Sequence, residues 1–297
     1  MKHFHEQHPA LPPAGSALPR RHALLWALAA TAFCAASPAG AQTPAPAPLR
    51  IGVTPGSLAD SVEVAAKEAR QQGLEVQVIE FTDWTTPNTA LAAGDIDLNY
   101  FQHQAFLNNA IQERGYPLVS VAVGLLPNIG LYSLKVQRFA DLKDGARVGV
   151  ANDPVNQGRG LLLLQKAGLI QLKPGVGDRP GLNDIAANPR KLRFSEIEGP
   201  QLVRALDDLD LAQGYPAHFV NAGRPQVAGS ALLYSGIDDL NYAIRFVARK
   251  DRAQDPRIQR FVQIYQQSPA VRTRIHQSFA GNDRLYSLPW LSQARSG

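Results

Sequence analysis

Short apolar segments with the alternation of a β-strand take turns with longer segments of helical period along most of this chain. Residues 49–53 are predicted as a short buried strand, residues 61–72 as a helix that ends at Gly73, and residues 75–81 as the next strand. Two parallel strands need such a crossover between them. We therefore predict an α/β protein with mostly parallel sheets.

The alternation occurs in two successive runs. The first run continues with helices at residues 87–93 and 104–114 and strands at residues 95–100 and 118–123. The second run predicts strands at residues 147–151 and 191–197, and helices at residues 158–167, 183–187 and 201–206. Each run has enough apolar residues for a core of its own, so we expect two lobes.

The last strand, predicted at residues 242–248, and the helical region at residues 255–279 have no further strand to pair with, so we expect them to return to the first lobe. The first lobe then comprises residues 49–132 and 240–297, and the second comprises residues 133–239. Crossovers near residues 131–135 and 235–242 would join the lobes and leave a ligand cleft between them, which is a preferred site for small molecules.

The N-terminal residues are predicted to be a targeting sequence. Arg20 and Arg21 precede an apolar run at residues 23–36, which is too short to span a bilayer comfortably, and small residues follow it. We expect residues 1–41 to be a signal peptide cleaved after Ala41, residues 42–48 to be a linker, and the mature chain to be periplasmic. A lipid anchor at Cys34 is disfavoured because bulky Phe33 precedes that cysteine.

Composition excludes several function classes for the mature chain. Cys34 is the only cysteine, so no disulfide, thiolate nucleophile or cysteine zinc site is expected. Removing residues 1–41 takes away three cations and one acid, so the net charge falls from +5 to +3. The remaining charges of both signs are interspersed, which argues against nucleic acid as a partner. Neither a phosphate-binding loop nor a dinucleotide fingerprint occurs, and we expect no cofactor and no metal.

Three segments carry a family resemblance, namely GDIDLNYFQH at residues 94–103, NDPVNQGR at residues 152–159 and LDD at residues 206–208. They resemble the NlpA family, the methionine-binding proteins of methionine ABC importers, in order across residues 49–290. The resemblance implies the two-lobed periplasmic-binding-protein fold, an amino-acid ligand in the cleft, an ABC permease of the inner membrane as partner, and no enzymatic activity. Most members of the family are lipoproteins, which the Phe33-Cys34 pair does not fit.

The resemblance also implies a set of ligand-binding residues. It aligns aromatic walls, a motif histidine, a polar segment and two later tyrosines with this sequence at Trp84, Phe101, His103, Tyr132, Asn152, Asn156, Arg159, Tyr215 and Tyr242. The residues themselves favour Arg159, because Asn152-Asp153-Pro154 is a helix start and the first turns of a helix attract an anion. By pattern alone, Arg159 fits a surface ion pair equally well.

Other residues have alternative interpretations. His103 stands where a strand passes into a helix, so it is expected to be either a hydrogen-bond partner of the ligand or a helix cap. Trp84 lies in a loop after a strand, which favours a cleft wall over the core. Asp95 and Asp97 would face the same side of a strand, yet a structural turn explains them better than catalysis.

Two positions depart from the family pattern. Tyr215 and Ile244 stand where the family has asparagines that contact the ligand's amino-acid head. We therefore expect weaker L-methionine binding than is usual in the family, or preference for a carboxylate or sulfonate without an α-amino group. Ile244 and its neighbour Arg245 should point to opposite faces of their strand, so one of them faces the cleft. A periplasmic enzyme on the same scaffold and a surface interaction protein are the alternative functions.

Overall fold

The structure is a computed structural model that describes residues 47–293, with side chains to Leu291. The predicted signal peptide, its cleavage site, Cys34 and most of the predicted linker lie outside the described residues. The described residues belong to one compact unit that spans residues 45–297. Among residues 47–293, we find no helix that combines the length and apolarity needed to cross a membrane.

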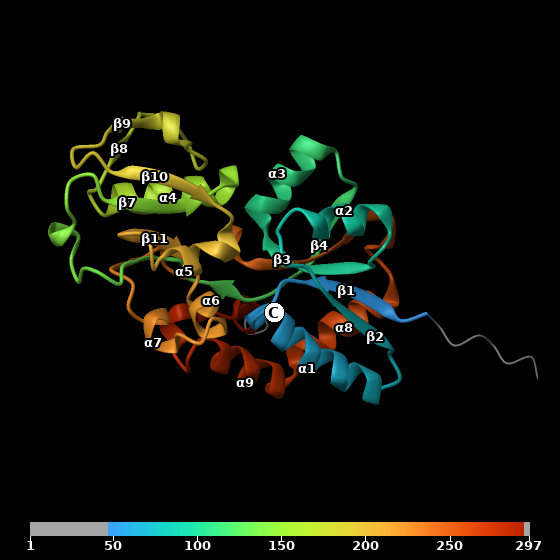
Figure 1. The fold of residues 1–297 in the computed structure, drawn as a ribbon. Coiled ribbons are helices and arrows are strands. Elements are labelled where there is room, and N and C mark those ends of the chain that lie inside the picture. Colours follow the sequence, from blue (N-terminus) through green and yellow to red (C-terminus); the bar gives the residue numbers. More distant parts are fainter. Residues whose placement is uncertain (1–46, 294–297) are drawn as a thin grey trace, which may run out of the picture. The chain divides into compact units, whose positions relative to one another are not determined.

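The first sheet has the strand order β2-β1-β3-β13-β4 (Figure 1). Strand β1 is parallel to β2 and β3, whereas β13 is antiparallel to both β3 and β4. Helices α1 and α8 lie on one face of this sheet and α2 on the other (Figure 1). The strands are β1 (Leu49–Val53), β2 (Val76–Glu80), β3 (Leu98–His103), β4 (Leu118–Val123) and β13 (Ile244–Arg249). The helices are α1 (Ser57–Gln71), α2 (Thr86–Ala93), α3 (Gln104–Arg114), α8 (Pro256–Gln267), α9 (Pro269–Ser278) and α10 (Pro289–Gln293).

The second sheet has the order β10-β7-β11-β6-β12 and repeats the parallel arrangement. Strand β7 is parallel to β10 and β11, and β6 is antiparallel to β11 and β12. The strands are β6 (Gly130–Tyr132), β7 (Arg147–Ala151), β10 (Arg193–Ile197), β11 (Leu211–Gly214) and β12 (Leu233–Tyr234). The helices are α4 (Pro154–Lys166), α5 (Leu202–Ala205), α6 (Pro216–Asn221) and α7 (Pro225–Ala228).

Smaller elements connect these layers. Two short antiparallel pairs are β5 (Leu126–Pro127) with β14 (Tyr286–Ser287), and β8 (Gln171–Leu172) with β9 (Ile185–Ala187). The single 3-10 turns are η1 (Phe139–Asp141), η2 (Leu182–Asp184), η3 (Gly199–Gln201), η4 (Leu240–Tyr242), η5 (Lys250–Arg252) and η6 (Asp283–Leu285).

The second sheet begins earlier in the chain than the expected boundary between residues 132 and 133. Residues 130–132 form β6, and Leu131 pairs with both Gln213 and Leu233 of this sheet. Strand β13, in contrast, lies within the first sheet between β3 and β4. The chain therefore passes from the first sheet to the second before Gly130, and not at residues 131–135 as expected.

Two predicted elements were wrong in detail. The helix expected at residues 183–187 is the turn η2 followed by strand β9, whose residues pair with β8. The helical region expected at residues 255–279 is two helices that meet at Ser268. The Ser268 hydroxyl accepts a hydrogen bond from the Val271 N–H at 3.1 Å, and Pro269 starts the second helix because it has no N–H to continue the first.

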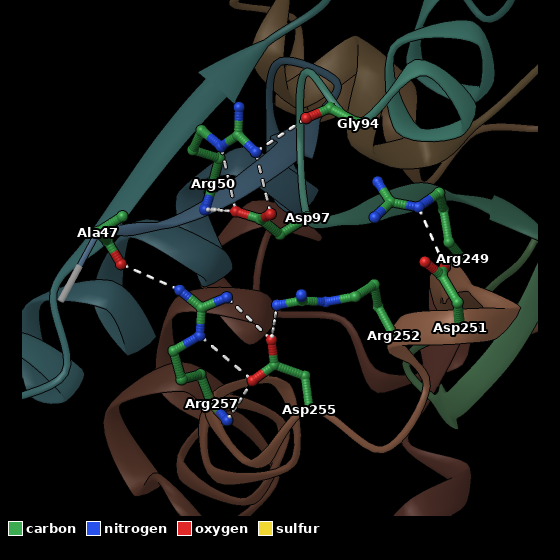
Figure 2. A network of polar contacts seen from close by, with 9 residues as sticks. All are labelled: Ala47, Arg50, Gly94, Asp97, Arg249, Asp251, Arg252, Asp255 and Arg257. Atoms are coloured by element: carbon green, nitrogen blue, oxygen red, sulfur yellow. Dashed lines mark hydrogen bonds and ion pairs between the residues drawn. The ribbon is translucent and has the colours of Figure 1, made fainter.

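Arginine–carboxylate contacts hold the edge of the first sheet where β1 begins (Figure 2). Arg50 binds both oxygens of Asp97, with a closest contact of 3.0 Å, and donates to the Gly94 carbonyl. Beside this pair, Arg252 and Arg257 both bind the Asp255 carboxylate at the start of α8. Asp97 therefore has a structural role, and its bond from the Arg50 N–H explains why β3 starts at Leu98 and not at residue 95.

Candidate functional site

A cavity of about 580 Å³, counting the space at its mouth, lies where loops after the parallel strands of both sheets meet. This position is expected for ligands of open α/β sheets. Its wall is largely apolar and contains no Asp or Glu. The lining residues are Thr54, Pro55, Ser57, Leu58, Trp84, Phe101, Gln102, His103, Phe106, Leu125, Pro127, Asn156, Tyr215, Ala217, His218, Ile244 and Phe279.

His103 and Asn156 join the two sheets at this cavity. His103 ends β3, and its Nδ1 accepts a hydrogen bond from the Phe106 N–H at 3.1 Å, which caps α3. Because Nδ1 is an acceptor, the proton of the neutral ring lies on Nε2, which donates to Asn156 Oδ1 at 3.2 Å. Burial, together with the positive charge of Arg159, lowers the pKa of His103 to about 3. His103 is therefore neutral at physiological pH and serves as both helix cap and donor.

Asn156 is fully used by its neighbours. It lies in the first turn of α4, whose N-cap Asp153 accepts from the Asn156 backbone N–H at 2.9 Å, as the Asn-Asp-Pro pattern predicted. The Asn156 Nδ2 amide donates to both oxygens of Asp153. Its Oδ1 accepts from the Tyr215 hydroxyl at 3.0 Å as well as from His103. Asn156 therefore fixes the positions of three side chains around the cavity wall.

Arg159 lies one turn further along α4 and is only 5% exposed. Its guanidinium donates to the Tyr215 hydroxyl at 3.3 Å and to Ser235 Oγ at 3.2 Å, and it lies 4.0 Å from the centroid of the Tyr242 ring. No carboxylate of residues 47–293 forms an ion pair with it, and its buried Nε has no hydrogen-bond partner among them. Asp178, Asp238 and Asp239 line the same pocket as Arg159 without forming an ion pair with it. A buried cation without an ion-pair partner favours the approach of an anion.

Trp84 closes the cavity from the side of the first sheet. It lies in the loop between β2 and α2, with its indole 6.2 Å from the Tyr215 ring and 6.3 Å from the His218 ring, measured between centroids. Its ring also lies directly against Gly199, where an added Cβ would clash with the indole. Gly199 and Tyr215 belong to the half of the chain that carries the second sheet, so Trp84 forms a contact across the cavity.

Strand β13 turns Ile244 toward the cavity. Ile244 is 5% exposed and belongs to the wall, while Arg245 points elsewhere and donates to the Leu240 carbonyl at 2.8 Å. This outcome fits the expected alternation of neighbouring residues along a strand. The wall at residue 244 is consequently apolar.

The structure does not bring all nine predicted site residues to the cavity. Trp84, Phe101, His103, Asn156 and Tyr215 line it, whereas Arg159 and Tyr242 lie behind Asn156 and Tyr215 in an adjoining pocket. Tyr132 is fully buried in the core, where it packs on Phe219 and donates to the Ala228 carbonyl. Asn152 is exposed to solvent.

Most of the lining residues were not predicted from the sequence, and Gln102 and His218 are two polar ones among them. Gln102 follows Phe101 in the motif at residues 94–103, and its amide is held by Asn88 and Asn99. His218 lies in α6 without a motif around it, and its Nδ1 is buried with no hydrogen-bond partner among residues 47–293. Burial lowers the pKa of His218 to about 4, so its ring is neutral at physiological pH.

The chemical groups of the cavity wall can be compared with those of catalytic and binding sites. Within residues 47–293, no lining hydroxyl is hydrogen-bonded to a histidine, so no nucleophile and base are paired. The same residues contain no group of three His, Cys, Asp or Glu side chains that could hold a metal ion. Apolar surface combined with a few fixed polar groups is typical of a binding site.

Comparisons with known proteins point to one family. The sequence model of the NlpA lipoprotein family matches residues 49–285. The "D-methionine-binding lipoprotein MetQ" of Salmonella typhimurium is 42% identical over 223 residues, covering 73% of this chain and 81% of that protein. An ABC transporter periplasmic substrate-binding protein from Coxiella burnetii is 40% identical, with a TM-score of 0.72 over 78% of this chain and 97% of that one. A Burkholderia cenocepacia nutrient-binding protein bound to methionine is 37% identical, with a TM-score of 0.73 and the same coverage.

Proposed function

Because this chain belongs to the NlpA lipoprotein family, we propose that it is the solute-binding receptor of an ABC importer and that it binds methionine or a close analogue. The two sheets would form two lobes, the first from residues 49–129 and 240–293 and the second from residues 130–239. The ligand would lie in the cavity between them. No bond of the ligand would be made or broken.

The observation that carries this proposal is the state of Arg159. A guanidinium that is 5% exposed and has no carboxylate partner within residues 47–293 is costly, unless an anion completes its surroundings. A ligand carboxylate could accept hydrogen bonds from this guanidinium, including from the unpartnered Nε. The Trp84, Phe101 and Ile244 side chains offer an apolar wall for the rest of such a ligand.

Closure of the lobes would follow from contacts on both sides. A ligand shifts a conformational equilibrium only by its differential affinity for the two states. Trp84, Phe101 and His103 would contribute from the first lobe, and Asn156, Arg159 and Tyr215 from the second. Only the closed form presents all six, so ligand binding would favour it, and the closed complex would dock on the permease in the inner membrane.

We further propose that the mature protein acts in the periplasm after cleavage behind Ala41. The names of the relatives contain the word lipoprotein, which favours an anchor, whereas Phe33 before Cys34 disfavours one in this chain. The mass of the N-terminal peptide of the protein exported from cells decides between the two. A peptide that starts at Gln42 supports cleavage, and one that starts at a diacylated Cys34 contradicts it.

The ligand itself tests the function. We would denature freshly purified protein, identify the released small molecule by mass spectrometry, and titrate it back into refolded protein by calorimetry. Stoichiometric binding of an unaltered carboxylate ligand is expected. Recovery of a chemically altered ligand would point to the alternative of a periplasmic enzyme, and absence of any saturable binding would contradict the proposal.

A further inference from the structure

The cavity wall is unsuited to a positively charged ligand group, and this bears on the ligand class of the receptor proposed above. None of its lining residues is an Asp or Glu. Asp153, the N-cap acid of α4, has both oxygens bound by the Asn156 amide, and Asp178, Asp238 and Asp239 lie in the adjoining pocket that holds Arg159. A buried ammonium needs a countercharge or several free acceptors, because losing its hydration is costly.

The neutral acceptors of the wall are mostly occupied. Asn156 Oδ1 already accepts from both His103 and Tyr215. His103 Nδ1 accepts from the Phe106 N–H, and Gln102 Oε1 accepts from the Asn88 amide. Among the remaining acceptors of this wall, His218 Nδ1 is buried without a partner in residues 47–293, and the Thr54 and Ser57 hydroxyls also line the cavity. These acceptors are uncharged, so they supply no countercharge for a buried ammonium.

Two guanidiniums contribute positive charge close to His103 in the cavity wall. Arg159 and Arg245 each have a buried Nε without a partner, and neither forms an ion pair with a carboxylate of residues 47–293. Both lie near enough to His103 to oppose its protonation. The same field would oppose an ammonium in the cavity and favour an anion.

Ile244 and Tyr215 are the wall residues that decide this selectivity. Ile244 presents an apolar side chain with no acceptor, and the Tyr215 hydroxyl donates its proton to Asn156 while accepting from Arg159. Ile244 therefore offers no acceptor to a ligand amine, and the Tyr215 oxygen already faces the Arg159 guanidinium.

We propose that the cavity selects an organic monoanion, a carboxylate on an apolar body without an α-ammonium group, over the corresponding zwitterionic amino acid. This inference rests on the proposed receptor function and narrows its ligand class to the desamino analogues of methionine. The carboxylate would lie toward Arg159, and the apolar body would lie against Trp84, Phe101 and Ile244.

Calorimetry on the mature chain, stripped of ligand by unfolding and refolding, tests the inference with L-methionine and its desamino analogue methylthiobutanoate. We expect methylthiobutanoate to bind about tenfold more tightly or better. Equal or tighter binding of L-methionine overturns the inference while the receptor function stands. Failure of both ligands to bind at millimolar concentration overturns the inference and the methionine-like function together.

A variant pair locates the selectivity. Ile244→Asn adds an amide oxygen to the wall and should shift the affinity ratio toward L-methionine by about tenfold. Ile244→Leu keeps the wall apolar, so methylthiobutanoate should remain the tighter ligand of that variant. An unchanged ratio in an Ile244→Asn variant that unfolds cooperatively would contradict the role of Ile244. Should that variant not fold, the wild-type ratio still decides the main inference.

Discussion

Replacement of Arg159 by alanine should separate ligand binding from stability. Truncating one member of a buried charge pair costs about 2 kcal/mol or more, which is about a 30-fold loss of affinity. Other contributions decide the unfolding free energy of the empty protein. The variant loses hydrogen bonds to Tyr215 and Ser235, worth about 1 kcal/mol each, and the contact with the Tyr242 ring. It also loses a buried cation that has no carboxylate partner among residues 47–293. Removing this cation relieves the cost of burying a charge, which offsets the lost contacts.

The unfolding free energy of the empty Arg159→Ala protein should therefore stay within about 1 kcal/mol of wild type. Urea unfolding without ligand and calorimetry with the released ligand measure the two quantities separately. Arg159→Lys keeps the positive charge but loses the planar guanidinium that can bind both carboxylate oxygens. Its affinity for the ligand should therefore lie between those of wild type and Arg159→Ala. Lys67→Ala, an exposed cation of α1, is the control and should change neither quantity. A loss of affinity below about 0.5 kcal/mol, or a large loss of stability, would remove Arg159 from the site.

Three further predictions concern the cavity and the sheet edge. Trp84→Ala should weaken ligand binding by about 1–3 kcal/mol in calorimetry while the unfolding midpoint of the empty protein moves little. Gly199→Ala should also weaken binding because its Cβ would clash with the indole. Burial opposes ionisation of Asp97, but the Arg50 contacts outweigh it and lower the pKa of Asp97. Asp97→Asn should therefore lose about 1 kcal/mol at pH 7, a difference that urea unfolding should find smaller below about pH 4. Because the folded pKa of His103 is about 3, the unfolded chain binds more protons below about pH 6.5. The unfolding free energy should thus fall as the pH drops from about 6.5 to about 3, and it should fall less steeply in the His103→Gln variant.

Much of the fold was predictable because its signals are local. The expected ranges of β4, β7 and α3 agree with the structure, since alternation, helix period and a terminating Gly115 define them. The helix expected at residues 183–187 was wrong because five residues are too few to distinguish a helical repeat from the alternation of a strand. There, pairing of β9 with β8 decides the structure, and no local pattern announces it.

The site was predictable in part for the same reason. His103, Asn156 and Tyr215 meet at the cavity because each follows or ends a strand or starts a helix at the same edge of its sheet. Tyr132 was expected beside them, but it lies within β6, and the pairing of that strand turns its side chain into the core. His218 could not be predicted, because only the packing of α6 brings it to the wall.

The hydrogen-bond pattern at the cavity would also limit how a ligand drives the proposed closure. His103 and Asn156 bond directly to each other across the two sheets, and Arg179 donates to Asn109 at 2.7 Å at a second crossing point. These contacts need no ligand, so they favour closure equally with or without one. A ligand can shift the equilibrium only through groups that its presence newly satisfies. Arg159 Nε and His218 Nδ1 are buried polar atoms without a partner in residues 47–293. An anion bound to Arg159 would be attracted strongly only in the closed form, where the lobes exclude water. The receptor would therefore respond to ligand chiefly through Arg159, and Arg159→Ala should lose ligand-induced closure in small-angle scattering even at ligand concentrations that saturate the variant.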